Sequence, residues 1–369
     1  MAKVPSRMAT DRTDEAHMTA MRSAALGLSR RLRSWEGLLL ILLVLVVVWN
    51  TSSVPGYLDP RNQINLLTLS QEKAIIVLAM AFVIIGGEID LSVASIMALS
   101  GVIVATLFEQ GTPMEIAIVV ALGAGLLAGL NNAFWVAVAG LPSLAVTLAG
   151  LIGYRGVARL LIEDRSIGGF PDWFDAITGR ALVGPLSLSL LILVVLVVVA
   201  LVVLHLTGFG RTVYAVGNNR EAARFSGVRV MRTKFALFLM SGLVAAIAGI
   251  LVASRLGAIR GSTGEGFELD IITIVLFGGV SIFGGRGTMV GVALSILVIL
   301  NLRNGLALAN LTGNTQLGVI GLLLILSVLG PNLVGMARDR LARRSAGPGT
   351  AGPGTGGDRV ESIAETISG

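Results

Sequence analysis

The stretch PLSLSLLILVVLVVVALVVLHL, residues 185–206, decides the fold. It contains no charged residue, and nearly all of its side chains are large and apolar. A helix needs about 20 consecutive apolar residues to cross the roughly 30 Å hydrocarbon core of a bilayer. This stretch therefore predicts a transmembrane helix.

The same criterion, applied outward along the chain, predicts nine further spans. They lie near residues 36–54, 64–86, 92–109, 115–139, 143–162, 235–257, 270–284, 288–308 and 315–335. We therefore expect an all-α fold, a polytopic membrane helical bundle of about 10 transmembrane helices that occupies residues 35–336. Counts of nine and eleven are the alternatives.

The composition agrees with this class. The chain has 369 residues, of which 54% are hydrophobic and 14% are charged, whereas soluble domains have about 25% charged residues. It has no cysteine and two histidines, which excludes a disulfide framework and makes a metal centre unexpected. We expect no cofactor.

Lysine and arginine gather in a basic tail (residues 1–34), in the loop 207–234 and just after the last predicted span. Such clusters mark the cytoplasmic side of membrane proteins. Ten spans place all three on one side, so both termini are predicted to be cytoplasmic. This topology explains the net charge of +6 without nucleic acid. The Gly- and Pro-rich tail, residues 337–369, is predicted to be disordered.

The sequence favours a transporter over an enzyme. It has no GxxxxGK[ST] phosphate-binding loop, and none of its three lysines follows a glycine. His205 is the single histidine of the predicted membrane region, so acid–base chemistry has few candidates. Energy must then come from a partner, from an ion gradient or from simple diffusion. A gradient-driven transporter would have Glu72 and Asp90 as its obvious proton carriers.

Two glycine-rich breaks, GGEIDLS (86–92) and GGVSIFGGRG (278–287), interrupt apolar stretches on the predicted cytoplasmic side. They resemble each other weakly, as a parallel repeat would. Broken helices often line substrate paths, but ordinary tight turns are an equal interpretation, and Asp90 fits either a structural or a gating role. Asn131 and Asn132 interrupt a span and can bind a neutral polar solute. The candidate path or gating residues are Glu88, Asp90, Ser92, Asn131, Asn132, Gly278 and Gly279.

Other features of the spans predict packing. Gly125 and Gly129 form a GxxxG pair, which lets helices approach closely in lipid. Arg155 and Arg159 are four residues apart on one helix face and are predicted to form structural ion pairs. The neighbours Glu72 and Lys73 point in different directions, so each needs its own partner or an aqueous cavity.

The loop 207–234 contains the string NNREAARFSG, residues 218–227. Asn218 or Asn219 can cap a short helix with Glu221 in its first turn. Ala222 and Ala223 would give that helix a smooth face, and Gly227 would end it in a left-handed conformation. Such a helix suits docking into a partner, whereas a simple basic loop is the alternative. The predicted coupling residues are Asn219, Glu221, Ala222, Ala223 and Gly227.

Four motifs stand in order along the chain: EIDLSVASIMALSG (88–101), YRG (154–156), AVGNNREAARFSGV (215–228) and GFELDIITIVLFGGVSIFGGRGT (266–288). Together they resemble the permease subunits of bacterial ABC importers for monosaccharides, the ribose/xylose/rhamnose branch, over residues 62–332. Ala94 stands where that family usually has a glycine. The resemblance implies that residues 221–227 couple ATP hydrolysis in a partner to opening of the path.

The resemblance also implies a multi-pass protein of the bacterial cytoplasmic membrane, surrounded by lipid, that is not itself an enzyme. Its expected partners are a second permease subunit (identical or different), a cytoplasmic ABC ATPase and an extracytoplasmic sugar-binding protein. Rhamnose or a pentose-like sugar is the expected substrate; an autoinducer, nucleoside or amino acid is the alternative. Specificity would lie in the soluble receptor, which agrees with the lack of an evident aromatic sugar platform among only 5% aromatic residues.

Overall fold

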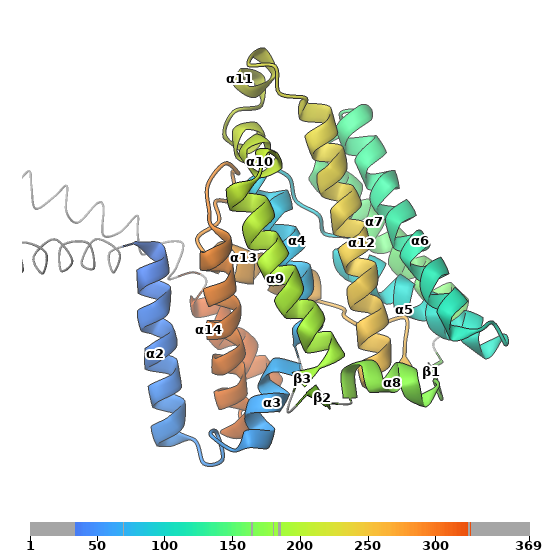
Figure 1. The fold of residues 1–369 in the computed structure, drawn as a ribbon, viewed down its shortest axis with the longest axis vertical. Helices are drawn as coiled ribbons and strands as arrows, with labels where there is room; N and C mark the ends of the chain where they lie inside the picture. Colours follow the sequence, from blue (N-terminus) through green and yellow to red (C-terminus); the bar gives the residue numbers. More distant parts are fainter. Residues whose placement is uncertain are drawn as a thin grey trace, which may run out of the picture. The chain divides into compact units, whose positions relative to one another are not determined.

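The computed structural model describes residues 34–323, apart from 69, 164, 180, 184 and 185, together with residue 325. The predicted basic tail, except Ser34, and the predicted Gly/Pro-rich tail lie outside these residues. The described chain is almost entirely helical (Figure 1), which confirms the all-α prediction. Its helices include α2 (Trp35–Ser53), α3 (Pro60–Thr68), α4 (Gln71–Ile85), α5 (Val93–Glu109), α6 (Met114–Ala133), the π-helix η1 (Phe134–Val138), α7 (Ser143–Ile162), α8 (Asp172–Gly179), α9 (Leu188–Leu206), α10 (Gly208–Asn218), α11 (Arg220–Phe225), α12 (Val230–Leu256), α13 (Phe267–Phe277) and α14 (Met289–Leu308). Residues 313–323 are also helical.

Strands in the described part are two short antiparallel pairs. β1 (Ile167–Gly168) pairs with β4 (Ala258–Ile259), and β2 (Ala181–Val183) pairs with β3 (Leu186–Ser187). In Figure 1 these pairs lie with α3 and α8 at one end of the bundle, whereas α10 and α11 lie at the other end. The strands therefore join segments at the ends of the predicted spans, and β3 shortens the predicted span 185–206, because α9 begins only at Leu188.

Seven helical segments of the described chain are long and apolar enough to cross a membrane: Trp35–Ser53, Pro60–Ile85, Met114–Val138, Ser143–Ile162, Leu188–Leu206, Val230–Leu256 and Met289–Leu308. They correspond to seven of the predicted spans. Of the other three, α5 has 17 residues, α13 has 11 because Gly278 ends it early, and the predicted span 315–335 runs beyond the described residues. The count of about ten is thus not confirmed, and the cytoplasmic location of the termini stays a prediction.

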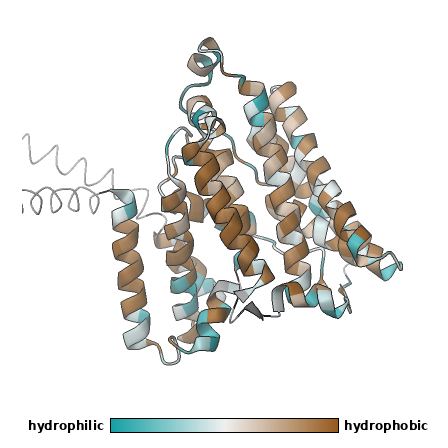
Figure 2. Ribbon diagram, viewed as in Figure 1, coloured by the Kyte–Doolittle hydropathy of each residue, from teal (hydrophilic) through white to brown (hydrophobic). Residues whose placement is uncertain are grey.

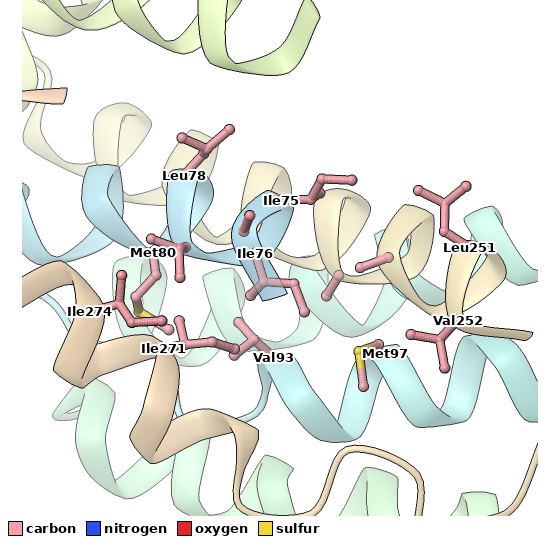
Figure 3. Close-up of a cluster of buried hydrophobic side chains, with 14 of the residues drawn as sticks. Ile75, Ile76, Leu78, Met80, Val93, Met97, Leu251, Val252, Ile271 and Ile274 are labelled. Atoms are coloured by element: carbon pink, nitrogen blue, oxygen red, sulfur yellow. The ribbon is translucent and has the colours of Figure 1, made fainter. Parts of the chain in front are cut away.

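Helix α4 forms the core of the bundle. All of its residues except Lys73 are buried. Figure 3 shows its side chains Ile75, Ile76 and Met80 among residues of α5, α12 and α13, such as Met97 and Ile271. Because protein rather than lipid surrounds much of the surface of α5 and α13, these helices can be shorter than the roughly 20 residues that a lipid-exposed span needs.

The outer helices show the opposite pattern. Helices α2 and α9 are apolar along their length (Figure 2), yet most of their residues are not buried. Val44, Leu45, Val194 and Val198 are each half exposed, at 50–60%. Large contiguous apolar surfaces of this kind are rare on soluble proteins. They fit contact with lipid.

Helix α12 packs against α5 and α6 through glycines. A Cβ atom at Gly249 would collide with the carbonyl oxygen of Met97, and one at Gly242 would lie 2.7 Å from the Cα of Gly129. The backbones therefore touch directly, which confirms that the predicted GxxxG pair, Gly125 and Gly129, lies at a helix contact.

Partly buried ion pairs connect one end of α4 to the neighbouring helices. Glu72 accepts a hydrogen bond of 2.7 Å from Arg255 of α12. Lys73 lies 2.8 Å from Asp270 of α13, which also lies 2.9 Å from Arg303 of α14. Each of the neighbouring charges thus has its own partner, as the sequence predicted, and four helices are joined at this end.

The glycine contacts predict a clear stability difference. Gly249→Ala should lower the free energy of unfolding by about 1–3 kcal/mol, because its methyl group must displace backbone atoms of α5. Gly123→Ala is the matched control in α6, since no atom lies within 4 Å of a Cβ there. It should be neutral or slightly stabilising. Denaturant or thermal unfolding of the purified protein in detergent measures both; equal effects would contradict the packing.

Candidate functional site

The two glycine-rich breaks end their helices in the same way. After α4, Gly87 has φ +79° and the Glu88 N–H donates to the carbonyl of Val83 over 3.1 Å. After α13, Gly279 has φ +84° and the Val280 N–H donates to the carbonyl of Val275 over 3.4 Å. Both are helix C-caps of the Schellman type, in which a left-handed residue favours glycine. This geometry agrees with the weak resemblance between the breaks.

The two breaks also meet. The Gly285 N–H donates to the carbonyl of Ile85 over 2.8 Å, and a Cβ at Gly284 would lie 2.7 Å from the Cα of Gly87. Gly217 of α10 packs at the same place, where a Cβ would collide with the Ile85 carbonyl. We call this contact of residues 86–87, 217–218 and 284–285 the glycine junction. It brings both breaks into backbone contact with the segment that precedes α11.

Asp90 begins a polar network beside the glycine junction. Its carboxyl group is fully buried. Oδ1 accepts hydrogen bonds from the Ser92 N–H over 3.0 Å and from the Ser92 hydroxyl over 2.6 Å, and Oδ2 accepts from the Ser241 hydroxyl of α12 over 2.8 Å. Ser92 Oγ in turn accepts from Asn132 Nδ2 of α6 over 2.8 Å. The break is thereby connected to α6 and α12.

The network continues to a cavity. Asn132 Oδ1 accepts from the Tyr154 hydroxyl of α7 over 3.0 Å, and the Tyr154 oxygen accepts from Asn131 Nδ2 over 2.9 Å. Asn131 Oδ1 accepts from the indole N–H of Trp135 over 3.2 Å. Asn131, Trp135 and Tyr154 line a cavity of about 680 Å³ between α6 and α7, which opens to the surface and whose other walls are apolar. A continuous chain of hydrogen bonds thus leads from a buried carboxyl group to this cavity.

The structure brings together four of the seven predicted path residues: Asp90, Ser92, Asn131 and Asn132. The two predicted glycines lie apart from them. A Cβ at Gly278 would lie 2.8 Å from Val292 of α14, and Gly279 packs against Trp35, whose indole N–H donates to the Phe277 carbonyl over 2.9 Å. These glycines permit helix contacts and do not line the cavity.

Glu88 has a different environment from Asp90. It forms an ion pair with Lys234, in the first turns of α12, and both side chains are more than nine-tenths buried. Since Lys234 also ends the predicted coupling loop, this pair connects the first break to the segment after α11. Glu88 therefore connects the first glycine-rich break with the predicted coupling loop 207–234.

The predicted coupling loop 207–234 contains the helices α10 and α11 and the beginning of α12. Asn219, rather than Asn218, caps α11, because its Oδ1 accepts the Ala222 N–H over 2.9 Å. Gly227 has φ +83°, as predicted. The expected smooth face is wrong: Ala222 is exposed but Ala223 is buried, because successive helix residues point about 100° apart.

Arg155 and Arg159 both contact the loop between β4 and α13. Arg159 forms an ion pair with Glu265, as predicted. Arg155 instead donates to the carbonyl oxygens of Gly261 over 3.1 Å and Thr263 over 2.6 Å. The prediction of ion pairing is corrected for Arg155, because the loop presents backbone carbonyls at that point.

Sequence reasoning missed several residues of this region. Lys234 could have been identified from the sequence as a partner of Glu88. The two have opposite charges on the same predicted side of the membrane, and a buried charge needs such a partner. Tyr154 was noticed in the YRG motif but was given no site role, and Trp135 and Ser241 had no signal, since contacts between helices depend on the tertiary fold. Phe225 is 90% exposed within a polar loop, a pattern that could have been noticed.

Comparison with known proteins agrees with this architecture. Residues 62–328 match the family described as "branched-chain amino acid transport system / permease component". The chain belongs to this family. The ribose import permease protein RbsC of Bacillus subtilis (strain 168) is 33% identical over 304 residues, which cover 82% of this chain and 93% of that protein. No solved structure matches.

Two further relatives are similar over most of their length. The autoinducer 2 import system permease protein LsrD of Enterobacter sp. (strain 638) is 33% identical over 310 residues, 81% of this chain and 93% of that protein. The xylose transport system permease protein XylH of Escherichia coli (strain K12) is 32% identical over 350 residues, 78% of this chain and 88% of that protein. The resemblance to ABC sugar permeases is confirmed, and the chain is a multi-pass permease of the cytoplasmic membrane.

The structure also weakens the gradient-driven alternative. Its two candidate proton carriers are both engaged, since Glu72 pairs with Arg255, and both carboxyl oxygens of Asp90 accept hydrogen bonds. Neither group lines the cavity of about 680 Å³.

The pair of Glu88 and Lys234 predicts strong coupling between the two positions. Lys234→Met should lower the free energy of unfolding by about 3–5 kcal/mol, because it leaves a buried carboxylate without its partner. Adding Glu88→Gln should recover much of this loss. Arg232→Met, on an exposed neighbour, is the control and should change stability by less than about 0.5 kcal/mol. Additive effects of the two substitutions in unfolding experiments would contradict the pairing.

Proposed function

We propose that this chain is the membrane-spanning permease subunit of an ATP-driven importer that translocates a monosaccharide, rhamnose or a pentose-like sugar, across the cytoplasmic membrane. The observation that carries the proposal is the connection between an exposed helix and a helix break. Helix α11 protrudes at one end of the bundle (Figure 1), and Lys234 ties the segment after it to Glu88. The names of the ribose and xylose relatives support a sugar as the substrate.

Helix α11 is the proposed docking element for a cytoplasmic ABC ATPase. Phe225 is 90% exposed at its end, and Arg220 and Arg224 are exposed beside it. A protruding aromatic ring with flanking cations fits an apolar cleft with an acidic rim. Asn219 and Gly227 fix the two ends of the helix, and Glu221 is favourable in its first turn. The small side chain of Ala222 lets a partner approach the helix closely, and the buried side chain of Ala223 packs the helix against the rest of the chain.

We further propose how the docked helix moves the path. Lys234 holds Glu88, and seven residues later on the same helix Ser241 holds Asp90. A spacing of seven residues places both on one face of α12. The break is therefore attached to α12 at two points, so a displacement of α11 that moves the start of α12 also moves Asp90, Ser92 and the asparagines beyond them.

Other partners follow from exposed surfaces. The cavity lies between α6 and α7, and its lining residues Leu141 and Val157 are exposed apolar side chains. Polar groups such as Asn131 are costly in lipid, so we propose that a second permease subunit covers this surface. At the opposite end from α11, the acidic residues of α8, of the loop before α13 and of the first turn of α13 are the proposed contact for an extracytoplasmic sugar-binding protein; they are Asp172, Asp175, Glu265 and Glu268.

A second candidate substrate is an autoinducer of the kind named for the LsrD relative, because that protein is as similar in sequence as the ribose permease. A nucleoside or an amino acid remains a more distant alternative in the same superfamily.

Uptake of labelled sugars, rhamnose first, in cells with and without this gene tests the proposal. We expect uptake to require the gene and ATP, and to persist when a protonophore is added while ATP is maintained. Loss of uptake on protonophore addition with ATP still high would reject the ATP-driven class. Uptake of labelled autoinducer but of no sugar would favour the second candidate.

The docking role of α11 predicts a specific defect. Phe225→Asp should reduce uptake about tenfold or more, because a charge replaces the apolar contact with the ATPase. The protein should still reach the membrane, since the ring makes little contact with the rest of the chain. Phe225→Leu is the matched control and should retain most of the uptake. Normal uptake by Phe225→Asp, at equal membrane abundance, would argue against docking through this residue.

A further inference from the structure

We infer that the cavity between α6 and α7 is a binding subsite for the ring of an uncharged sugar, and that Asp90 and Trp135 together set which of its groups donate hydrogen bonds. The inference rests on the proposed function and extends it, because it assigns selectivity to the permease as well as to a soluble receptor. Asp90 does not line the cavity, so its role would be that of a positioning residue.

The chemistry of the cavity suits a sugar ring. Its volume of about 680 Å³ is within the range of about 300–1,000 Å³ typical of small-molecule sites. In the described chain its lining contains no charged side chain: the polar groups come from Asn131, Tyr154 and Trp135, and the rest is apolar. Neutral amide and hydroxyl groups match sugar hydroxyls, while the indole ring offers a flat apolar face to the C–H groups of a sugar ring.

The position of Trp135 supports a site rather than a membrane anchor. Tryptophans at membrane interfaces direct the indole N–H to water and headgroups, whereas here it donates to Asn131 Oδ1 over 3.2 Å. Trp135 also lies in the π-helix η1, where the Ala139 N–H donates to the Phe134 carbonyl over 2.9 Å. Single-turn π-helices occur often at functional sites. The indole is thus fixed beside the asparagine that faces the cavity.

Asp90 sets the directions of the hydrogen bonds at the buried end of the chain. Its Oδ1 accepts the backbone N–H of Ser92, so this oxygen acts as an acceptor, and the Ser92 hydroxyl, 2.6 Å away, must donate to it. Because the single hydroxyl proton of Ser92 is donated to Asp90, Ser92 Oγ can only accept a hydrogen bond from Asn132. This requires the Asn132 NH₂ group to face Ser92, and it turns Asn132 Oδ1 toward Tyr154.

The same reasoning reaches the cavity. The Tyr154 hydroxyl lies 3.0 Å from Asn132 Oδ1 and 3.2 Å from the Ala128 carbonyl oxygen, so its proton points to that side and its oxygen accepts from Asn131 Nδ2. Asn131 Oδ1 faces the indole N–H of Trp135, a group that can only donate, so Trp135 holds the same orientation of this amide from the other end. One N–H of the Asn131 amide is used in this chain, and the second is left to donate to a solute. The subsite therefore presents a fixed donor, and a sugar oxygen at that position acts as an acceptor.

Fluorinated sugars provide the test, because fluorine can accept a weak hydrogen bond but cannot donate one. For a sugar that the uptake panel shows to be transported, we would measure KM, Vmax and competition by its monodeoxy and monofluoro analogues. At one ring position the fluoro analogue should compete better than the deoxy analogue. Trp135→Leu should raise KM about tenfold with little change in Vmax, as expected for a lost binding contact.

Two buried serines, Ser92 just before α5 and Ser95 in its first turn, give a matched pair of variants. Ser92→Ala removes the hydroxyl that connects Asp90 to Asn132. It keeps the hydrogen bonds that the backbone N–H of residue 92 and the Ser241 hydroxyl donate to Asp90. Ser95→Ala removes an equally buried hydroxyl that donates to the Leu151 carbonyl over 2.8 Å and has no part in the chain. Ser92→Ala should reduce the preference for the fluoro over the deoxy analogue, because only Trp135 and the Ala128 carbonyl then orient the chain, whereas Ser95→Ala should keep it. Tyr154→Phe cuts the chain nearer the cavity and should act like Ser92→Ala.

The outcomes separate the two levels of the proposal. If no sugar is transported, the proposed function fails and the subsite fails with it. ATP-dependent sugar uptake with a normal KM in both Trp135→Leu and Tyr154→Phe would overturn the subsite alone. A raised KM in Trp135→Leu, together with an unchanged analogue preference in Ser92→Ala and Tyr154→Phe, would overturn the role of Asp90. Equal loss of preference in Ser92→Ala and Ser95→Ala would also overturn it, since that is a general packing effect.

Discussion

Two ion pairs with buried carboxylates hold the antiparallel helices α4 and α12 together at their ends, and the remaining structure depends on them. Arg255 binds Glu72 where α4 begins, and Lys234 binds Glu88 just after α4 ends. Between these pairs the contact is apolar and close. In surroundings of low dielectric constant an unpaired charge is very costly, so the pairs tolerate little change in register between the two helices. The position of the first break is therefore determined by α12, the helix that begins just after the proposed docking element.

Glycines bring the backbones of α12 and its neighbouring helices into direct contact. Gly249 of α12 touches α5, Gly242 touches α6, and the glycine junction joins both breaks to α10. Where backbones touch, there are few side-chain rotamers that can absorb a displacement. A motion that starts at α11 is consequently transmitted through rigid elements, and the polar network of Asp90 lies directly beside the junction that receives it.

The sequence predicted the parts that follow from local composition. The long apolar segments, the capped helix at Asn219, the left-handed Gly227 and the need for partners at Glu72 and Lys73 all depend on residue type and spacing. What it could not predict depends on which helices are neighbours. The convergence of Asp90, Asn132 and Tyr154 joins three segments that are distant along the chain, and the inward turn of Ala223 depends on how α11 rests on the bundle. Short helices such as α13 were misjudged in length, because burial in protein relaxes the requirement that lipid sets.

The π-helix at the end of α6 has a consequence for divergence within the family. A π-helical turn is a single-residue insertion into an α-helix, and each residue of an α-helix advances the side chains by about 100°. A related permease that lacked one residue between Phe134 and Val138 would keep its membrane span, yet the aromatic side chain that faces the cavity here would be replaced by a different neighbour. Insertions and deletions in this one turn would thus alter the wall of the cavity without changing how α4 and α12 pack against each other.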